Sequence, residues 1–392
     1  TQSVRETGEQ LGAEYILNGS VQRAGQNLRI NARVIRVRDE VTVWSKTFDR
    51  PLTDVFAIQD EISLGIVNSL RLSLGSGRRR YETSVEAYDF YLRARASIIQ
   101  RGVGGYDASI HPFEQAIAKD AAFAPAYAGL AAARVSRSGR FRYDQAEEMI
   151  KMRAAAQTAA KLDPLLPEAH EALGMVYARD GQWEQSEKSF RRAIELGGGR
   201  SSSYDAFAVY LLWPLGRTEE ALKQLRFAEN TDPLSPEVHS YLSMVLTSLR
   251  RYDEAAGYCD KLPAAYPSRN VCLAQAQFGR GKVGEAIQIL EPAYRRGLVE
   301  GSPILSYLGC AYARTGRRGE AEKIAAVSSF NPFNQAAIFA CLGDKDRTFE
   351  SLDRAAVVGP FRMGRILTSP EYDLLRGDPR LAALRNRVGL PL

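Results

Sequence analysis

The sequence predicts a mainly α-helical protein, built as a solenoid of about seven to eight helical hairpins behind a small α/β module. Two observations lead to this prediction. From about residue 85 onward, one pattern of small and bulky apolar residues returns roughly every 34 residues, as in repeat proteins. Residues 1–75 have a different rhythm, in which apolar residues alternate first and then change to helical spacing.

The first module, residues 1–75, begins with three strand-like segments. YILNGSVQ (15–22) and LRINARVIRV (28–37) are joined by a short turn in which Gly25 can supply a positive φ. VTVWSKTF (41–48) follows as a third strand, rich in β-branched and aromatic residues. The sequence therefore predicts two consecutive hairpin connections in one sheet.

A helix that begins near the N-cap Thr53 is expected to cover one face of this sheet. Its apolar residues fall on one helical face: Val55, Ile58, Ile62, Ile66 and Leu70. A β-β-β-α module of this size is thin. We therefore expect a preceding strand and helix upstream of Thr1, in a longer protein of which this chain is a fragment.

Residues 76–84 form the expected linker, followed by the repeat array over 85–368 and capping helices over 369–392. The linker contains Arg78, Arg79 and Arg80. We interpret this cluster as a solvated linker, with a phosphate or membrane contact as the alternative.

The repeat is clearest in LGMVYARDGQWEQSEKSFRRAIEL (173–196). We interpret it as two antiparallel helices that cross where Gly174 and Ser186 are small, with Gly181 ending the first helix. Pro167 and Pro236 stand where the first turn of a helix tolerates a missing N–H. One such pair cannot bury its apolar face alone, so neighbouring pairs must stack.

This pattern resembles the tetratricopeptide repeat (TPR) family, most strongly in 167–198 and 217–233 and clearly in 305–321. The resemblance implies a right-handed superhelix whose inner groove binds a peptide or protein segment. Residues 7–72 resemble the TolB-N-like module that precedes such arrays in large bacterial signalling proteins. That second resemblance implies an upstream winged-helix, nucleotide-cyclase or protein-kinase domain.

The groove is the site that this architecture supplies. Residues at the fifth, ninth, twelfth and thirteenth positions of each first helix would line it, and aromatic residues, Met and Arg are enriched in binding patches. The predicted groove residues are Met175, Arg179, Tyr210, Trp213, Met244, Gln275, Phe278 and Arg314. The alternative is that Tyr210, Trp213 and Phe278 belong to the core, and the repeat with Trp213 carries a one-residue insertion.

No catalytic, cofactor-binding or metal-binding residues are predicted, so we interpret the chain as a non-enzymatic scaffold. His170 and His239 share one repeat position and are expected to pack between repeats. Neighbouring acidic residues diverge by about 100° on a helix and suit a solvated face. Ser201–Ser203 lack the phosphate-loop pattern and are expected in an inter-repeat loop. The alternative function is a sensory region that controls an upstream cyclase, kinase or DNA-binding domain.

Composition limits the partners. The net charge of +6 is spread along the chain, which argues against a nucleic-acid face. The longest apolar stretch, 126–135, is too short to span a bilayer. Cysteines 259, 272, 310 and 341 have no C-x-x-C spacing, so we expect buried free thiols and favour a reducing, cytoplasmic compartment. An extracytoplasmic array behind an upstream anchor stays open, as do the partner and the oligomeric state.

Overall fold

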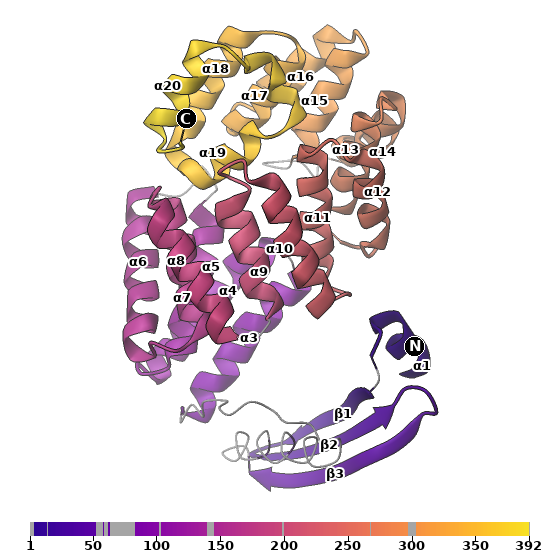
Figure 1. Ribbon diagram of the computed structural model, residues 1–392, viewed down its shortest axis with the longest axis vertical. Helices are drawn as coiled ribbons and strands as arrows, with labels where there is room; N and C mark the ends of the chain where they lie inside the picture. Colours follow the sequence, from indigo (N-terminus) through magenta and orange to yellow (C-terminus); the bar gives the residue numbers. More distant parts are fainter. Residues whose placement is uncertain are drawn as a thin grey trace. The chain divides into compact units, whose positions relative to one another are not determined.

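A computed structural model describes residues 4–13, 15–51, 58, 62, 83–101, 103–138, 145–197, 200–266, 268–296 and 303–391. The chain forms two compact units (Figure 1). The first holds Thr1–Phe90 with Ala118–Phe123, and the second holds Tyr91–Ile117 with Ala124–Leu392. The predicted linker lies almost wholly outside the described residues, so the predicted domain limits stay predictions.

The first unit contains the predicted three-stranded antiparallel sheet, in the order β1-β2-β3. Its strands are β1 (Tyr15–Ala24), β2 (Asn27–Arg36) and β3 (Val41–Pro51). Gly25 has a φ of 60°, which closes the turn between β1 and β2 as expected. Val34 of β2 stands opposite Leu17 and Trp44, and it is buried together with Leu28, Ala32 and Phe48. One face of the sheet therefore carries the core of this unit.

A helix precedes the sheet, α1 (Val4–Leu11), and the sequence did not predict it. Its eight residues contain only two large apolar side chains, Val4 and Leu11, which is too few to show a helical period. Gly8 lets α1 lie close to Val37, the residue that follows β2, because a Cβ at Gly8 would overlap the Val37 side chain. Of the helix predicted after Thr53, only Ile58 and Ile62 are described, and both are helical.

Eight helical hairpins follow in the described part of the chain, which confirms the predicted number. They are α3 (Val85–Arg101) with α4 (Val103–Lys119), α5 (Ala124–Ser138) with α6 (Gln145–Leu162), α7 (Pro167–Arg179) with α8 (Trp183–Gly197), α9 (Ser201–Phe207) and η2 (Ala208–Leu212) with α10 (Thr218–Thr231), α11 (Pro236–Ser248) with α12 (Tyr252–Lys261), α13 (Arg269–Gly279) with α14 (Val283–Arg295), α15 (Ile304–Arg314) with α16 (Arg318–Val327), and α17 (Pro332–Cys341) with α18 (Lys345–Ala355).

A C-terminal segment closes the array. It consists of η3 (Ala356–Val358), α19 (Pro360–Leu367), η4 (Pro370–Leu375) and α20 (Pro379–Arg387). Asp378 caps α20, because its carboxylate accepts a hydrogen bond from the Arg380 N–H. Leu375 and Leu384 are buried in a core shared with α17 and α18. The end of the chain is therefore folded onto the last hairpin.

The small residues of the repeat act as predicted. The Ser186 hydroxyl donates to the Gly174 carbonyl oxygen at 2.7 Å, and a Cβ at Gly174 would lie 2.9 Å from the Phe190 ring. Gly181 has a φ of 71° between α7 and α8, which only glycine adopts readily. Arg250 takes the same place between α11 and α12 with a φ of 61°.

The one-residue insertion near Trp213 is absorbed by a π-helical turn. The Trp213 N–H donates to the Ala208 carbonyl oxygen at 2.9 Å, five residues back, across η2. Ser201–Ser203 do not form the expected loop, because they open α9 and two of their hydroxyls hold the Glu171 carboxylate. An ionisable partner on the previous hairpin thus orders this helix start.

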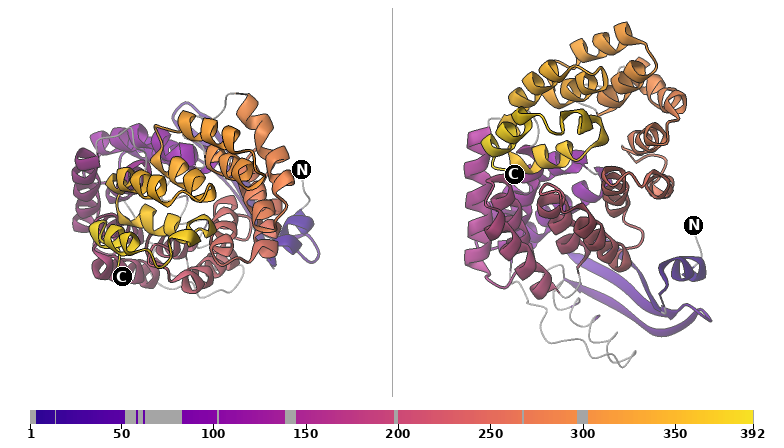
Figure 2. Two further views of the ribbon diagram at one scale, coloured as in Figure 1. Left: turned by 90° about the horizontal axis from the view of Figure 1, so that it is seen from above. Right: turned by 45° about the horizontal axis from the view of Figure 1, so that its top comes forward.

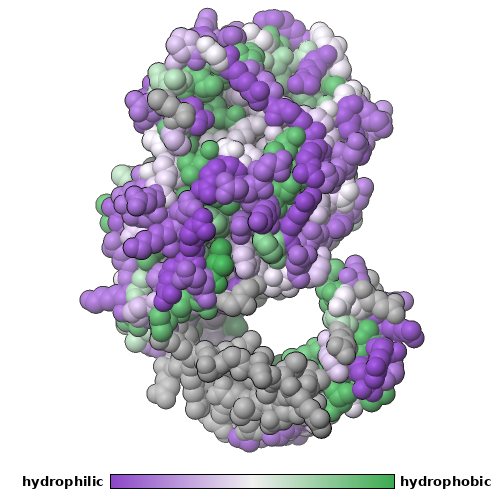
Figure 3. Space-filling model, in the orientation of Figure 1, coloured by the Kyte–Doolittle hydropathy of each residue, from purple (hydrophilic) through white to green (hydrophobic). Residues whose placement is uncertain are grey.

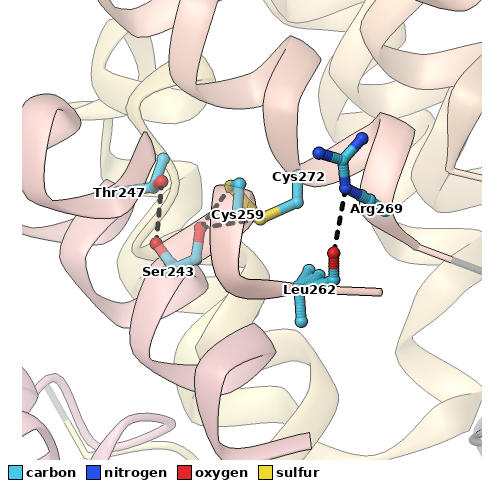
Figure 4. The surroundings of a disulfide bond; sticks show 6 residues. All are labelled: Ser243, Thr247, Cys259, Leu262, Arg269 and Cys272. Carbon is cyan, nitrogen blue, oxygen red and sulfur yellow. Dashed lines mark hydrogen bonds between the residues drawn. A yellow bond between two sulfur atoms is a disulfide. The ribbon is translucent and has the colours of Figure 1, made fainter. Parts of the chain in front are cut away.

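All four cysteines are paired, which contradicts the prediction of free thiols. Cys259–Cys272 joins α12 to α13, and Cys310–Cys341 joins α15 to α17. Figure 4 shows the first bond, where the Ser243 hydroxyl of α11 lies 3.1 Å from the Cys259 sulfur and 3.0 Å from the Cys272 sulfur. Helix stacking brings these pairs together, and no local spacing shows it. The basis for favouring a reducing compartment is therefore lost.

From α5 onward, first helices pack against each other within α5, α7 and α9 and within α11, α13, α15 and α17, and each second helix packs against the next first helix. The first helices therefore lie together on one side of the helical unit, which we call its inner side. The unit curves so that the C-terminal helices lie beside the middle of the chain, where α19 packs against α7 (Figure 2). The face in Figure 3 is mostly hydrophilic, with hydrophobic residues in small separate areas.

Candidate partner-binding groove

The eight predicted groove residues lie on the first segments of five consecutive hairpins, from α7 to α15, but their exposure differs. Met244 keeps 37% of its surface exposed, Arg314 is exposed and Tyr210 is half-buried. The other five have 3–8% exposed: Met175, Arg179, Trp213, Gln275 and Phe278. The inner side is therefore covered in part.

The C-terminal segment covers the first part of the groove. The Arg179 guanidinium donates to the Val357 carbonyl oxygen at 3.3 Å, and the Tyr210 ring centre lies 5.4 Å from that of Phe361. The Trp213 indole N–H donates to the Thr368 hydroxyl at 2.8 Å. Three predicted groove residues thus contact a part of the same chain that lies more than a hundred residues away in sequence.

The second part of the groove lies on α11, α13 and α15 and keeps exposed side chains. The Arg314 guanidinium carbon lies 4.2 Å from the centre of the Phe278 ring, an arrangement typical of cation–π contacts. Met244 presents a flexible thioether on α11. Side chains of these kinds are enriched where proteins bind other proteins.

α4, α9 and α11 together form an acidic and tyrosine-rich cluster, which the sequence did not single out. The hydroxyls of Tyr106 and Tyr241 donate to the same oxygen of Glu237, at 3.2 and 3.0 Å. Burial raises the pKa of the Glu237 carboxyl, and the two tyrosine hydrogen bonds offset part of that rise. Burial, and then the charge of Glu237, hold the pKa of Asp205 well above its usual range.

Tyr210 connects this cluster to the C-terminal segment. Its hydroxyl lies 3.1 Å from that of Ser136 on α5. Burial raises the pKa of Tyr210, the Ser136 hydrogen bond and the Arg365 charge lower it, and the charges of Glu237 and Asp205 raise it. Both the carboxylates and the guanidinium of α19 therefore act on this one hydroxyl.

The family model described as Tetratricopeptide repeat matches residues 153–201 and 208–270. These residues run from α6 through α12 and include the hairpins whose small residues, left-handed glycine and stacked first helices were described above. The helical array is a tetratricopeptide repeat array.

Three solved structures are similar to parts of this chain. Human IFIT1, solved as a dimer with m7Gppp-AAAA, is 14% identical with a TM-score of 0.51, over 84% of this chain and 80% of that one. PilF from Pseudomonas aeruginosa is 17% identical with a TM-score of 0.42, over 60% of this chain and 98% of its own. Yeast Tom70 is 14% identical with a TM-score of 0.43, over 83% and 77%.

One curated relative is much closer in sequence over a short stretch. Putative adenylate cyclase 3 of Rhizobium meliloti (strain 1021) is 40% identical over 105 residues. The match covers 26% of this chain and 18% of that protein, so the two share less than a fifth of the relative's length.

The repeat positions show which of the residues that sequence analysis missed could have been found from the sequence. Asp205 stands at the fifth position of its first helix, a position expected to face the groove, and its acidic type was the available signal. Phe361, Arg365 and Thr368 are spaced 4 and 3, which places them on one helical face. That α19 would reach η2 and α11 depends on the curvature of the array, which no local pattern contains.

One of the two histidines is buried, and the packing of both between repeats stays a prediction. His239 of α11 is 4% exposed, with its ring centre 5.8 Å from that of Tyr258. The His170 ring nitrogen lies 2.8 Å from the Pro164 carbonyl oxygen. Among the described residues, no three side chains of His, Cys, Asp or Glu lie close enough together to hold a metal ion. Within the same residues, none of the helices combines the length and the apolar character that a membrane crossing requires.

Proposed function

We propose that the TPR array is a non-enzymatic scaffold that binds a peptide or protein segment in its inner groove. The observation that supports this most directly is the exposed Met244 and the Arg314–Phe278 pair on three consecutive first helices. The exposed side chains are Met244 and Arg314, and the buried Phe278 ring supports the Arg314 guanidinium from below. Methionine and arginine suit the contact surface of a docked segment.

The groove also offers two kinds of chemistry along its length. The section on α11, α13 and α15 provides apolar surface and one exposed guanidinium. The neighbouring cluster of Asp205, Glu237 and tyrosines provides carboxylates that lie in a low-dielectric setting, where a basic side chain would be favoured. A segment with both apolar and basic residues fits this surface best.

A display library of random peptides, selected against the complete 392-residue chain, tests this proposal. Peptides that dock in the groove are expected to lose binding to a Met244→Ala/Arg314→Ala variant. They should keep binding to Lys188→Ala, a change on the second helix α8 away from the inner side. Equal affinities for both variants would place binding elsewhere and refute the groove assignment.

We propose as a second function that the array is the sensory region of a larger bacterial signalling protein. The 40% identity to a putative adenylate cyclase over 105 residues favours this, and so does the resemblance of residues 7–72 to a TolB-N-like module. In the full gene product, a selected peptide should then change the cyclase activity, and the Met244→Ala/Arg314→Ala variant, which no longer binds the peptide, should not respond. Identical activities with and without peptide would argue against control through this array.

A further inference from the structure

Helix α19 has two different faces. Met363 points into the C-terminal core, together with Leu375 and Leu384. Phe361, Arg365 and Thr368, at positions i, i+4 and i+7, lie on the other face, and all three interact with residues of the groove. Helices that dock in protein grooves present their anchors with this spacing.

The groove side provides a partner for each of these residues. Tyr210 stacks against Phe361, and the Arg365 guanidinium carbon lies 5.4 Å from the centre of the Trp213 ring. The Thr368 hydroxyl is bonded to the Trp213 indole and lies 3.0 Å from the Ser248 hydroxyl. One surface, formed by α7, η2 and α11, therefore contacts an aromatic, a basic and a hydroxyl side chain in this order along α19.

Two glycines allow α19 to come this close. A Cβ at Gly364 would overlap the Pro214 carbonyl oxygen just after η2, and a Cβ at Gly359 would overlap the Arg179 guanidinium. Since a backbone oxygen cannot move aside as a flexible side chain can, Gly364 sets the depth at which the helix docks.

Aromatic rings hold the guanidinium of α19. The Arg365 guanidinium carbon lies 5.4 Å from the centre of the Trp213 ring and 5.4 Å from that of Phe361. Burial lowers the pKa of Arg365, and the hydroxyls of Tyr210 and Tyr241 act against this shift. The geometry at this place of a docked helix therefore suits a guanidinium that lies against aromatic rings.

We propose that the surface of α7, η2 and α11 is a helix-binding site that α19 occupies in the closed array. The partner that fits it is a helical segment with an aromatic residue, an arginine four residues later and a hydroxyl residue three further on. Such a partner binds by displacing α19, so the C-terminal segment is an internal competitor. This inference rests on the proposed scaffold function and adds the partner chemistry and its regulation.

The probe is a fluorescently labelled peptide of residues 358–370, which contains all three anchors. Its binding to the complete chain is compared with binding to Gly364→Ala, which pushes α19 away from Pro214 without weakening the helix itself. Gly257→Ala is the matched control, because that helical glycine has nothing within 4 Å of a new Cβ. Near-ultraviolet circular dichroism shows that each variant is folded.

We expect the peptide to bind Gly364→Ala at least roughly tenfold more tightly than wild type or Gly257→Ala, because apparent affinity scales with the fraction of open sites. A peptide with Phe361→Ala and Arg365→Ala should lose this binding. Thr368→Val, which removes only the hydroxyl bonded to Trp213, serves if Gly364→Ala does not fold.

Equal binding of the peptide to all three proteins, or no binding to any, would overturn the inference. So would equal binding of the peptide that lacks both anchors. Library peptides that need Met244 and Arg314 but bind wild type and Gly364→Ala alike would leave the scaffold function standing while this inference fails. The scaffold proposal is therefore tested by the effect of the Met244 and Arg314 substitutions on library peptides. The present inference is tested by the effect of Gly364→Ala on the α19 peptide.

Discussion

Reduction of the two disulfide bonds is expected to destabilise the C-terminal half of the TPR array. The bonds Cys259–Cys272 and Cys310–Cys341 close loops of 13 and 31 residues. Chain-entropy arguments give roughly 3 kcal/mol for the shorter loop and roughly 3.7 kcal/mol for the longer one. Because each repeat is stabilised mainly by its neighbours, the loss should be concentrated in α12–α17.

Urea unfolding followed by far-ultraviolet circular dichroism, with and without dithiothreitol, measures this effect. The oxidised chain should unfold at clearly higher urea, and the reduced chain should lose the helices of α12–α17 in an earlier step. Cys259→Ala/Cys272→Ala and Cys310→Ala/Cys341→Ala separate the two contributions. The fourfold alanine variant is the control, because dithiothreitol has nothing to reduce in it.

The result that would refute this reasoning is a wild-type curve that dithiothreitol does not move. A titration that finds four reactive thiols in the purified native chain would contradict the pairing itself. Since disulfides form and persist in oxidising compartments, a positive result would also favour a location outside a reducing cytoplasm.

Three further predictions concern single residues. Gly174→Ala should lower the free energy of unfolding by about 1–3 kcal/mol, because the new methyl group meets the Phe190 ring at 2.9 Å. Gly284→Ala is the control, since nothing lies within 4 Å of a Cβ at that position. Similar urea midpoints for the two variants would disprove the close crossing of α7 and α8. Ser186→Ala should cost about 1 kcal/mol through its lost buried hydrogen bond to Gly174, and an unchanged thermal midpoint would argue against that bond. Burial, then Lys261, lower the pKa of His239 below 6.5, so its contribution to stability is fully present above pH 6.5 and is lost as the pH falls from 6.5 through the lower pKa of the folded state. His239→Leu should flatten this slope of stability against pH, and equal slopes for the two proteins would contradict the prediction.

Much of the fold could be predicted from the sequence because the repeat is a local pattern that recurs. Gly181, Ser186 and Pro167 each reflect a requirement of one helix pair, so their spacing predicted the hairpins. The strands were predicted for the same reason, since Gly25 and the alternating residues around it lie within one hairpin. Helix α1 was missed because eight residues with two large apolar side chains show no period.

Local patterns could not predict whether the predicted groove is open or covered. The repeat register placed Arg179, Tyr210 and Trp213 on first segments, but what covers them is set by how far the array curves. The disulfides were missed for a similar reason, because stacking brings together cysteines whose spacing has no local meaning. Contacts between distant repeats are the part of this protein that no local pattern encodes.

The contact of α19 with α7, η2 and α11 also limits how this array can change in evolution. An open solenoid gains or loses a repeat easily, because each unit meets only its neighbours. Here, insertion or deletion of one hairpin between α11 and α18 would carry Phe361 and Thr368 away from Tyr210 and Trp213. This contact therefore limits the number of hairpins between α7 and α19, whereas the hairpins before α7 are not limited by it.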